Sequence, residues 1–366
     1  MECQRSNFRI SRVTVNSLLT ALGTLALLAQ ACPAADIDAG RRTFEAVCAA
    51  CHGMSGRPDP DSAVVRAFDP EPANLSDPLF NSREPADDWF MVVKYGGAAL
   101  GLSAQMPPHQ NVLSDEEIDD VVAYIKILAD TRSFPPGELN LMLPVRTKKA
   151  FPEDEWVWKS RFASRNGEDE FRNVIEFEKR LGRNGQTIVE LVHVNDGIDS
   201  EFREIELGYK HAFAYSRENL SLWSAAFVVS LPLTSDGEEE LVPYLAYARQ
   251  VSAAMTFQGS ARARLPFDDV DRGELEVAGI VHYAWSPWPR RVFPALEMTA
   301  TVPFEDEGGD RIQLTLLPQV RVGLTRGGHV ALNLGVEIPL SDQEYDWRLH
   351  LTLLWDFADG GFFQGW

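Results

Sequence analysis

The segment Cys48-Ala49-Ala50-Cys51-His52 holds the residues with the clearest chemical potential in this sequence. Two thiols separated by two residues can each add to one vinyl group of a porphyrin, and the histidine that follows can then bind the iron. The same spacing occurs in redox-active cysteine pairs and in half of a zinc site. A zinc site needs a second ligand pair, and the sequence has no other Cys-x-x-Cys. The motif therefore predicts one covalently attached haem c, with His52 as an axial iron ligand.

A sixth iron ligand is expected from Met106, which lies in a Gln-Met-Pro-Pro segment. Prolines keep such a segment extended, and a thioether is a usual axial partner that raises the reduction potential. His109 is the alternative and would lower the potential. Met54 is too near His52 in the chain to reach the opposite face of a haem, while Met91 lies in an apolar helical run that suits a core position.

Two helices are expected to position these ligands. The first covers Asp38–Cys48 and leads into the cysteine motif, with Phe44 on the same face as Gly40, which lets another backbone come close. The second begins at Ser114 and Glu117, whose spacing is that of a capping box. Its apolar residues recur at helical intervals: Ile118, Val121, Val122, Ile125 and Leu128. The two helices can pack across each other and hold the haem loop between them.

Residues 36–130 resemble a class I c-type cytochrome. The motifs stand in that family's order: the CAACH site, Ala73-Asn74-Leu75-Ser76, Gly96-Gly97, Ser103-Ala104-Gln105-Met106-Pro107-Pro108 and a terminal LSDEEIDDVVAYIKILA helix. The resemblance implies a small all-α domain that carries one electron and does not usually catalyse reactions itself.

Carried onto this sequence, the resemblance also assigns residues. It implies that the haem is linked covalently to Cys48 and Cys51. It also implies that His52 and Met106 are the axial ligands of the haem iron. It implies that Tyr124 contacts Gly40 and Phe44 where the terminal helices cross. Trp89 would either line the haem pocket or belong to the core.

Residues 1–34 have the pattern of an export signal peptide. The basic residues at its start are Arg5, Arg9 and Arg12. A mostly apolar stretch follows over Val15–Ala29, and small residues at Ala31 or Ala34 offer cleavage positions. The stretch is short for a membrane span, so an uncleaved anchor is the less favoured alternative. Cys32 leaves open a lipid-modified N-terminus.

Length and charge bound the rest of the chain. A chain of 366 residues is long for one ordinary domain and indicates about two. The formal net charge of -20 excludes nucleic acid as a partner, because phosphate would be repelled and no basic patch offsets this. Residues 131–152 break all periodicity with a Phe-Pro-Pro-Gly segment, Pro144 and the basic residues Arg146, Lys148 and Lys149. We therefore expect a linker there.

From residue 153 to 366 the pattern has period two. In the clearest case Ile312, Leu314, Leu316, Pro318, Val320 and Val322 alternate with Arg311, Gln313, Thr315, Leu317, Gln319 and Arg321. We expect twelve strands, beginning near residues 154, 170, 186, 202, 219, 241, 255, 273, 291, 311, 329 and 345. Strands of about ten residues suit a tilted membrane crossing, and an even number returns both ends of a closed barrel to the same side.

Charge is sorted by the parity of the connections between these strands. The odd connections (first, third and so on) hold 21 acidic and two basic residues. The even connections hold five arginines and one glutamate. Nearly all of the net charge therefore lies at one end of the expected barrel.

A soluble sandwich would show the same alternation, with its polar face in water and its apolar face in the core. The sorted connections, the aromatic residues near strand ends and a last strand that closes on Trp355 and Phe357 favour a membrane barrel. This last strand resembles the terminal strand of bacterial outer-membrane barrels. The predicted fold class is thus a small all-α cytochrome c domain followed by an antiparallel transmembrane β-barrel over residues 153–366. The whole chain resembles porin–cytochrome fusions, which carry electrons across the outer membrane and include iron-oxidising proteins.

A haem motif and a barrel pattern on one chain predict an electron-transfer protein. Haem c is attached after export and outer-membrane barrels keep both ends in the periplasm, so we expect the haem domain there and the acidic connections outside. Only a peptide segment, water or ions could fill the lumen of a twelve-stranded barrel. The chain would act as a tethered periplasmic carrier or as a conduit to an external redox partner. The acidic connections could concentrate metal cations such as ferrous iron, or bridge membrane lipid through divalent ions.

Two other function classes stay open. The barrel could be a solute channel with the haem domain as sensor or redox partner, or its inward charges could pair across a closed lumen. These charges are Arg161, Arg262, Arg264, Glu274, Glu276, Arg311, Arg321, Glu337 and Arg348. An enzyme is the least favoured class, because the sequence has no second haem motif and no nucleotide-binding loop. The histidines of the strand region also stand singly: His193, His211, His282 and His350.

Overall fold

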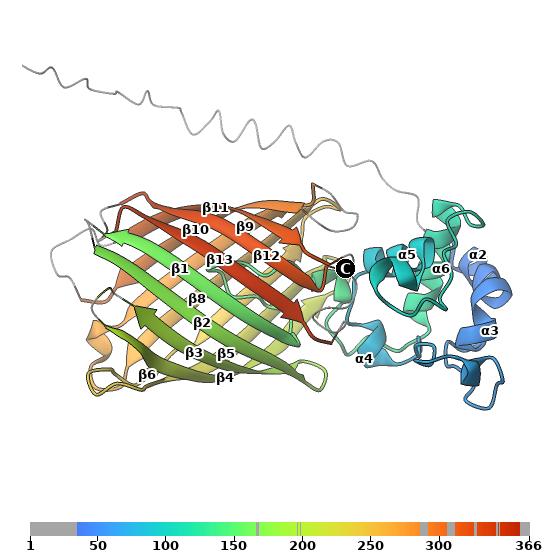
Figure 1. Ribbon diagram of the computed structural model, residues 1–366, viewed down its shortest axis with the longest axis horizontal. Helices are drawn as coiled ribbons and strands as arrows, with labels where there is room; N and C mark the ends of the chain where they lie inside the picture. Colours follow the sequence, from blue (N-terminus) through green and yellow to red (C-terminus); the bar gives the residue numbers. More distant parts are fainter. Residues whose placement is uncertain are drawn as a thin grey trace, which may run out of the picture. The chain divides into compact units, whose positions relative to one another are not determined.

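Helices precede strands along the chain, as the change of periodicity predicts (Figure 1). The computed structural model describes residues 35–358 except 166, 167, 196, 198, 286–291, 306–311, 326, 327, 342 and 344. The expected signal peptide, residues 1–34, lies outside the described residues. From Ala35 onward the chain forms one compact unit. Among the described residues, no helix combines the length and hydrophobicity that crossing a membrane requires.

The helical region is built from short elements. They are α2 (Ile37–Thr43), the π-helix η2 (Phe44–Cys48), α3 (Ala49–His52), η3 (Val65–Ala67), α4 (Pro78–Asn81), α5 (Ala86–Tyr95), η4 (Gly97–Leu100), α6 (Asp115–Ile127) and η5 (Gly137–Leu139). The helix expected over Asp38–Cys48 is confirmed, but its second half is a π-helix that runs into α3. The cysteine motif therefore lies where a wider helical turn meets an α-helical one.

Helices α2 and α6 cross at the contact that the sequence predicts. A Cβ atom on Gly40 would lie 2.0 Å from the carbonyl oxygen of Asp120, so only glycine permits this approach. The rings of Phe44 and Tyr124 pack with centroids 5.4 Å apart. The core around this crossing is apolar and includes Phe44, Leu75, Val93, Leu113, Ile118, Val121, Val122 and Ile125.

The strands form a closed antiparallel barrel (Figure 1). They are β1 (Glu155–Arg165), β2 (Glu168–Leu181), β3 (Gly185–Asn195), β4 (Ser200–Ser216), β5 (Ser221–Pro232), β6 (Glu240–Leu241), β7 (Tyr244–Gln250), β8 (Met255–Pro266), β9 (Glu274–Tyr283), β10 (Val292–Pro303), β11 (Gln313–Gly323), β12 (Val330–Pro339) and β13 (Trp347–Asp356). Strands β6 and β7 follow each other between β5 and β8 and form one interrupted barrel strand. The described residues thus give twelve barrel strands, each beginning within two residues of its expected position, and β1 closes the barrel against β13.

Antiparallel pairing places the odd connections at one end of the barrel, here called the odd end. The even connections, the start of β1 and the finish of β13 share the other end, the even end. The acidic and basic connections therefore lie at opposite ends, although several of their residues, including 286–291 and 306–311, are outside the described residues.

The barrel is polar inside and apolar outside. The buried inward glutamates of the described strands include Glu176, Glu190, Glu206, Glu276, Glu297 and Glu337. The exposed side chains of the wall include Phe177, Leu207, Trp223, Phe227, Leu245, Val277, Leu296, Met298, Val336 and Leu349. A soluble sandwich has the opposite arrangement, because its buried face is apolar. The sandwich alternative is therefore wrong, and the barrel is of the transmembrane kind.

Residues 139–151, which we call the plug, lie inside the barrel. Side chains of the barrel wall hold the main chain of the plug. The side-chain amide of Gln258 donates to the carbonyl of Met142 (2.7 Å), and the side-chain amide of Asn333 donates to the carbonyl of Leu143 (2.8 Å). Lys210 donates to the carbonyl of Phe151 (2.9 Å). The second half of the segment expected to be a linker is thus a fixed part of the barrel interior.

The plug enters and leaves the barrel by the same end. The Met142 carbonyl of the plug accepts a hydrogen bond from Gln258, which lies three residues from the even end of β8. Its deepest residue is Arg146, which pairs with Glu276 and Glu337, both close to the odd end. The chain then returns to the start of β1 at the even end.

Candidate haem site and barrel interior

The cysteine motif lies at the junction of η2 and α3. Cys48 ends the π-helix, while Cys51 and His52 lie on the following turn. The Nδ1 atom of His52 is 3.0 Å from the carbonyl oxygen of Ala73 and must donate to it, because a carbonyl only accepts. Nε2 is then the nitrogen with a free lone pair for iron. Burial lowers the pKa of His52 and the Ala73 bond partly opposes this, so the neutral, metal-binding form predominates.

A cavity of about 490 Å³, here called the haem cavity, is lined by both cysteines, His52 and Met106. Apolar side chains form much of the remaining wall: Val47, Phe68, Leu75, Trp89, Val92, Val93, Leu100 and Leu102. Burial, with Cys51 adding to it, raises the pKa of the Cys48 thiol to about 11, so this thiol is protonated. Thiols, imidazole, thioether and an apolar enclosure in one cavity are the set that a haem c requires.

Arg83 adds a polar contribution to this fit. It lines the haem cavity, and its Nε–H is buried without a hydrogen-bond acceptor. One of its terminal nitrogens donates to the carbonyl of Ala358 at 3.3 Å, which fixes the side chain. A haem carries carboxylates at its edge, and the unused Nε–H of Arg83 is a suitable donor to one of them. Arg83 belongs to none of the sequence motifs that predict the haem site.

Both candidates for the sixth ligand line the haem cavity. The Met106 carbonyl accepts from the amide of Gly97 (3.0 Å), and the His109 amide donates to Val93 (3.1 Å), so the two backbones are fixed. Burial lowers the pKa of His109. Met54 is exposed and absent from the lining. Met106 stays the predicted ligand, because its thioether combines a cavity position with the motif order.

Met91 and Trp89 also line the haem cavity. The Trp89 ring packs against Phe80 at a centroid distance of 5.4 Å, and it joins the core around α6. Trp89 therefore both lines the haem cavity and belongs to the core, which were the two alternatives expected for it. Met91 was expected only in the core, and helical periodicity alone does not show that one face of α5 borders a cavity.

Residues 35–125 match the family model described as "Cytochrome C oxidase, cbb3-type, subunit III". They form a c-type cytochrome domain. A search of curated protein sequences gives no match to the chain.

Solved structures resemble the barrel that follows the cytochrome domain. A structure of the NanC porin gives a TM-score of 0.42 at 9% identity and covers 54% of this chain and 98% of that chain. The COG4313 outer membrane channel from Pseudomonas putida F1 gives a TM-score of 0.44 at 11% identity and covers 58% of this chain and 99% of that chain.

The haem cavity of the cytochrome domain extends to the plug and to the even end of the barrel. Asn140, Leu141, Met142 and Lys149 of the plug line it. Barrel residues complete the lining: Glu155, Arg321, Gly328, His329, Leu354 and Asp356. A linker reading of residues 131–152 could not anticipate this. The basic residues Arg146, Lys148 and Lys149, ahead of a barrel rich in inward glutamates, were the available signal.

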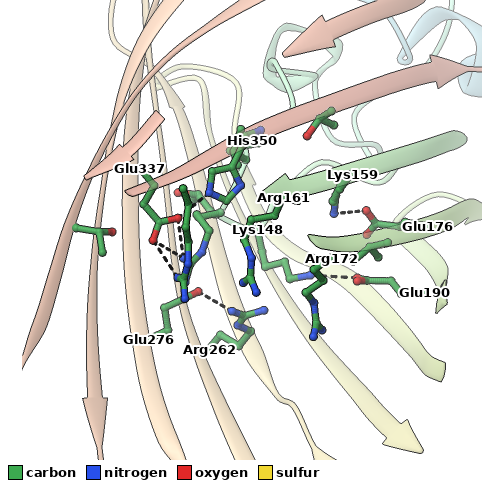
Figure 2. Close-up of a pocket in the computed structure, with 18 of the residues that line it drawn as sticks. Lys148, Lys159, Arg161, Arg172, Glu176, Glu190, Arg262, Glu276, Glu337 and His350 are labelled. Carbon is green, nitrogen blue, oxygen red and sulfur yellow. Dashed lines mark hydrogen bonds and ion pairs between the residues drawn. The ribbon is translucent and has the colours of Figure 1, made fainter. Parts of the chain in front are cut away.

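A second cavity of about 520 Å³, the lumen cavity, lies beside the plug inside the barrel (Figure 2). Leu143 to Lys149 of the plug line it. Seven of the expected inward charges also line it: Arg161, Arg262, Arg264, Glu274, Glu276, Glu337 and Arg348. Arg321 lines the haem cavity instead, and Arg311 lies outside the described residues.

Ion pairs tie the plug to the wall of the lumen. Arg146 pairs with Glu276 and Glu337, and Lys148 pairs with Glu190 at 3.1 Å (Figure 2). The carboxylate of Glu297 accepts from the backbone of Arg146 and, at 2.6 Å, from the Thr147 hydroxyl. Of the charges expected to face inward, Glu276 and Glu337 thus pair with Arg146 of the plug.

The histidines of the strand region remain separate from one another. His350 contacts Glu337 (2.7 Å) and His193 contacts the Ser200 hydroxyl (3.2 Å). His211 lies beside Tyr209. Within the described part of the chain, no group of three His, Cys, Asp or Glu residues could hold a metal ion.

Proposed function

We propose that this chain is a monohaem electron-transfer protein anchored in the outer membrane by its barrel, and that it exchanges electrons with a partner that reaches the lumen cavity from the odd end. One observation carries the proposal: the cavity lined by Cys48, Cys51, His52 and Met106 is also lined by the plug. Haem supplies a ferric–ferrous couple that carries one electron. The chain's own residues would hold that couple next to the plug and the even end of the barrel.

The plug supports this proposal because it separates the two cavities by little protein. Residues 140–142 line the haem cavity, and residues 143–148 line the lumen cavity. Lys149 lines both. A partner bound in the lumen cavity would be one plug segment away from the haem cavity, and ion pairs with the wall hold that segment in the lumen.

The orientation belongs to the proposal as well. Outer-membrane barrels keep both strand ends in the periplasm, which would put the cytochrome domain and the even end there and the odd end outside. The acidic odd connections would then face the exterior, where they would attract cations, including metal ions such as ferrous iron.

Sealed proteoliposomes test the proposal. The full chain is inserted with the cytochrome domain inside, a protease verifies its sidedness, and a membrane-impermeant reductant is added outside while haem absorbance is followed. Rapid reduction supports electron exchange through the barrel. Absence of reduction, followed by full reduction after detergent is added, would refute the exchange and leave the barrel as an anchor for a periplasmic carrier.

A solute channel is the second candidate, and the lumen cavity of about 520 Å³ with its polar lining favours it. Such a channel requires the plug to leave the lumen. Single-channel recording in a planar bilayer separates the two functions: the plugged structure predicts no conductance, and steady conductance of the parent protein would favour the channel.

A further inference from the structure

Three arginines lie side by side on the inner wall of β13, β1 and β2. Arg161 of β1 stands directly opposite Arg172 of β2 in the strand register. Arg348 of β13 pairs with Ala163, two positions along β1, and is therefore diagonal to Arg161. All three side chains line the lumen cavity, and Figure 2 shows Arg161 and Arg172 projecting into it. We call these three residues the arginine cluster.

The pairing of Arg161 with Arg172 is unfavourable for an antiparallel sheet. Like charges directly across two antiparallel strands destabilise the pairing. Proteins usually depart from such local rules at functional sites. The cluster lies in the half of the barrel wall nearer the odd end, and all three arginines line the lumen cavity beside the plug.

Among the residues that the structure describes, three carboxylates pair with the cluster. Arg161 pairs with Glu170, and Arg172 pairs with Glu204 at 2.5 Å. Arg348 pairs with Glu337 at 3.3 Å. That carboxylate is shared, because it also accepts from Arg146, Tyr345 and His350. One carboxylate thus serves two guanidinium groups.

Two hydrogen-bond donors of the cluster are unused. The Nε–H groups of Arg161 and Arg348 are buried and have no acceptor in the structure. A buried donor without a partner is unfavourable, and an acceptor that enters the cavity removes that cost. Both donors belong to guanidinium groups, whose planar fork matches the oxygens of carboxylate, phosphate and sulfate.

We propose that the arginine cluster binds the oxyanion group of a small molecule in the lumen cavity. The cavity volume of about 520 Å³ limits the ligand to a small molecule, and the plug makes the site a closed end. The odd connections carry most of the chain's negative charge and repel polyanions, so the ligand has one or two anionic groups. The site does not depend on electron transfer and stands on the wall geometry alone.

Isothermal titration of the detergent-solubilised full chain tests the site, with gluconate, inorganic phosphate and sulfate as separate probes. We expect at least one probe to bind, with affinity that falls as ionic strength rises. The double substitution Arg161→Gln with Arg172→Gln should lower the affinity at least about tenfold, since it removes two charge-assisted partners. Which probe binds most tightly identifies the anionic group.

The matched control is Arg272→Gln. Arg272 lies near the odd end, pairs with Glu238 and Asp268, and is absent from the cavity lining, so its loss should leave the affinity unchanged. A second variant, Arg161→Lys, keeps the charge and removes the unused Nε–H donor; it should weaken binding about tenfold even if the double variant does not fold. No binding of any probe to the parent chain, or equal affinity in Arg161→Lys, would overturn the proposal.

Discussion

His52 can present only one of its ring nitrogens to a metal, because the Ala73 carbonyl holds the proton on Nδ1. The residue that meets a metal from the other side decides the reduction potential, since a thioether raises it and a second imidazole lowers it. Met106 and His109 line the same cavity and lie on the same fixed segment. A substitution therefore shows more directly than their positions which of Met106 and His109 is the sixth ligand.

Replacing Met106 with alanine should remove the sulfur-to-iron band from the absorption spectrum of the ferric protein and lower its reduction potential, because a weaker ligand replaces the thioether. Met54→Ala is the control, since Met54 is exposed and lies outside the cavity lining. A spectrum of Met106→Ala that matches the parent would assign the sixth position to another residue, and His109→Ala would then be the next variant to record.

Helix α6 depends on its first residues for the close approach to α2. The Ser114 hydroxyl accepts from the Glu117 amide (3.3 Å), and the Glu117 carboxylate accepts from the Ser114 amide (2.8 Å), which is a complete capping box. The Glu117 carboxylate accepts from the Ser114 amide and also from the Ser114 hydroxyl (2.9 Å), and these two bonds hold the pKa of Glu117 below its usual range. The cap therefore stabilises the helix above the unfolded-state pKa of Glu117 and is lost as pH falls through the lower, folded-state pKa.

Ser114→Ala should lower the unfolding free energy of the cytochrome domain by about 1 kcal/mol at neutral pH. The difference between variant and parent should shrink as the pH falls below about 4.5. Denaturant unfolding of the full chain, followed by haem absorbance, measures both. Glu116→Gln, in the same first turn but outside the capping box, should behave like the parent. A pH-independent difference would show that Glu117 does not take part in the cap.

The plug is an element without regular secondary structure, and side chains of the wall replace the ladder that a strand would have. Glu297 is its main attachment: it accepts from the backbone amides of Arg146 and Thr147, from the Thr147 hydroxyl and from Gln319 (2.7 Å). The carboxylate is fully buried. Without the Glu297 carboxylate, several buried donors lose their acceptor, and each loss costs about 1–3 kcal/mol of stability.

Glu297→Leu should therefore release the plug and produce conductance events in a planar bilayer, where the parent chain shows none. Glu305→Leu is the matched control, because Glu305 follows the same strand but is exposed near the odd end. Silent recordings from a folded Glu297→Leu barrel would mean that the remaining ion pairs, those of Arg146 and Lys148, hold the plug without Glu297.

At the scale of the whole molecule, the barrel has the charge distribution of a membrane protein. Met298 lies near the middle of β10 and is exposed on the outer wall, and Leu340 is exposed just beyond the odd end of β12. Met298→Lys should destabilise the barrel in lipid by about 2–4 kcal/mol, and Leu340→Lys by at most about 1 kcal/mol. Urea unfolding in lipid vesicles, followed by tryptophan fluorescence, gives both values. Equal costs would contradict a bilayer centred on these strands.

Periodicity and motif order predicted most of this architecture. The strand starts, the α2–α6 crossing at Gly40 and the capping box at Ser114 all depend on residues close in sequence or on a repeated pattern, and the structure confirms them. The plug was missed because residues 139–151 show no periodic pattern and their partners lie far away in sequence, as Glu276 does from Arg146. The arginine cluster needed the strand register, which alternation alone does not give.

The plug is a loop whose two ends stay at one mouth of the barrel, so the chain never threads through the ring of strands. No barrel hydrogen bond has to break for the plug to be inserted or withdrawn. Closure of β1 against β13 and attachment of haem can consequently occur in either order during biogenesis, and a cytochrome domain already loaded with haem is no topological obstacle to assembly of the barrel.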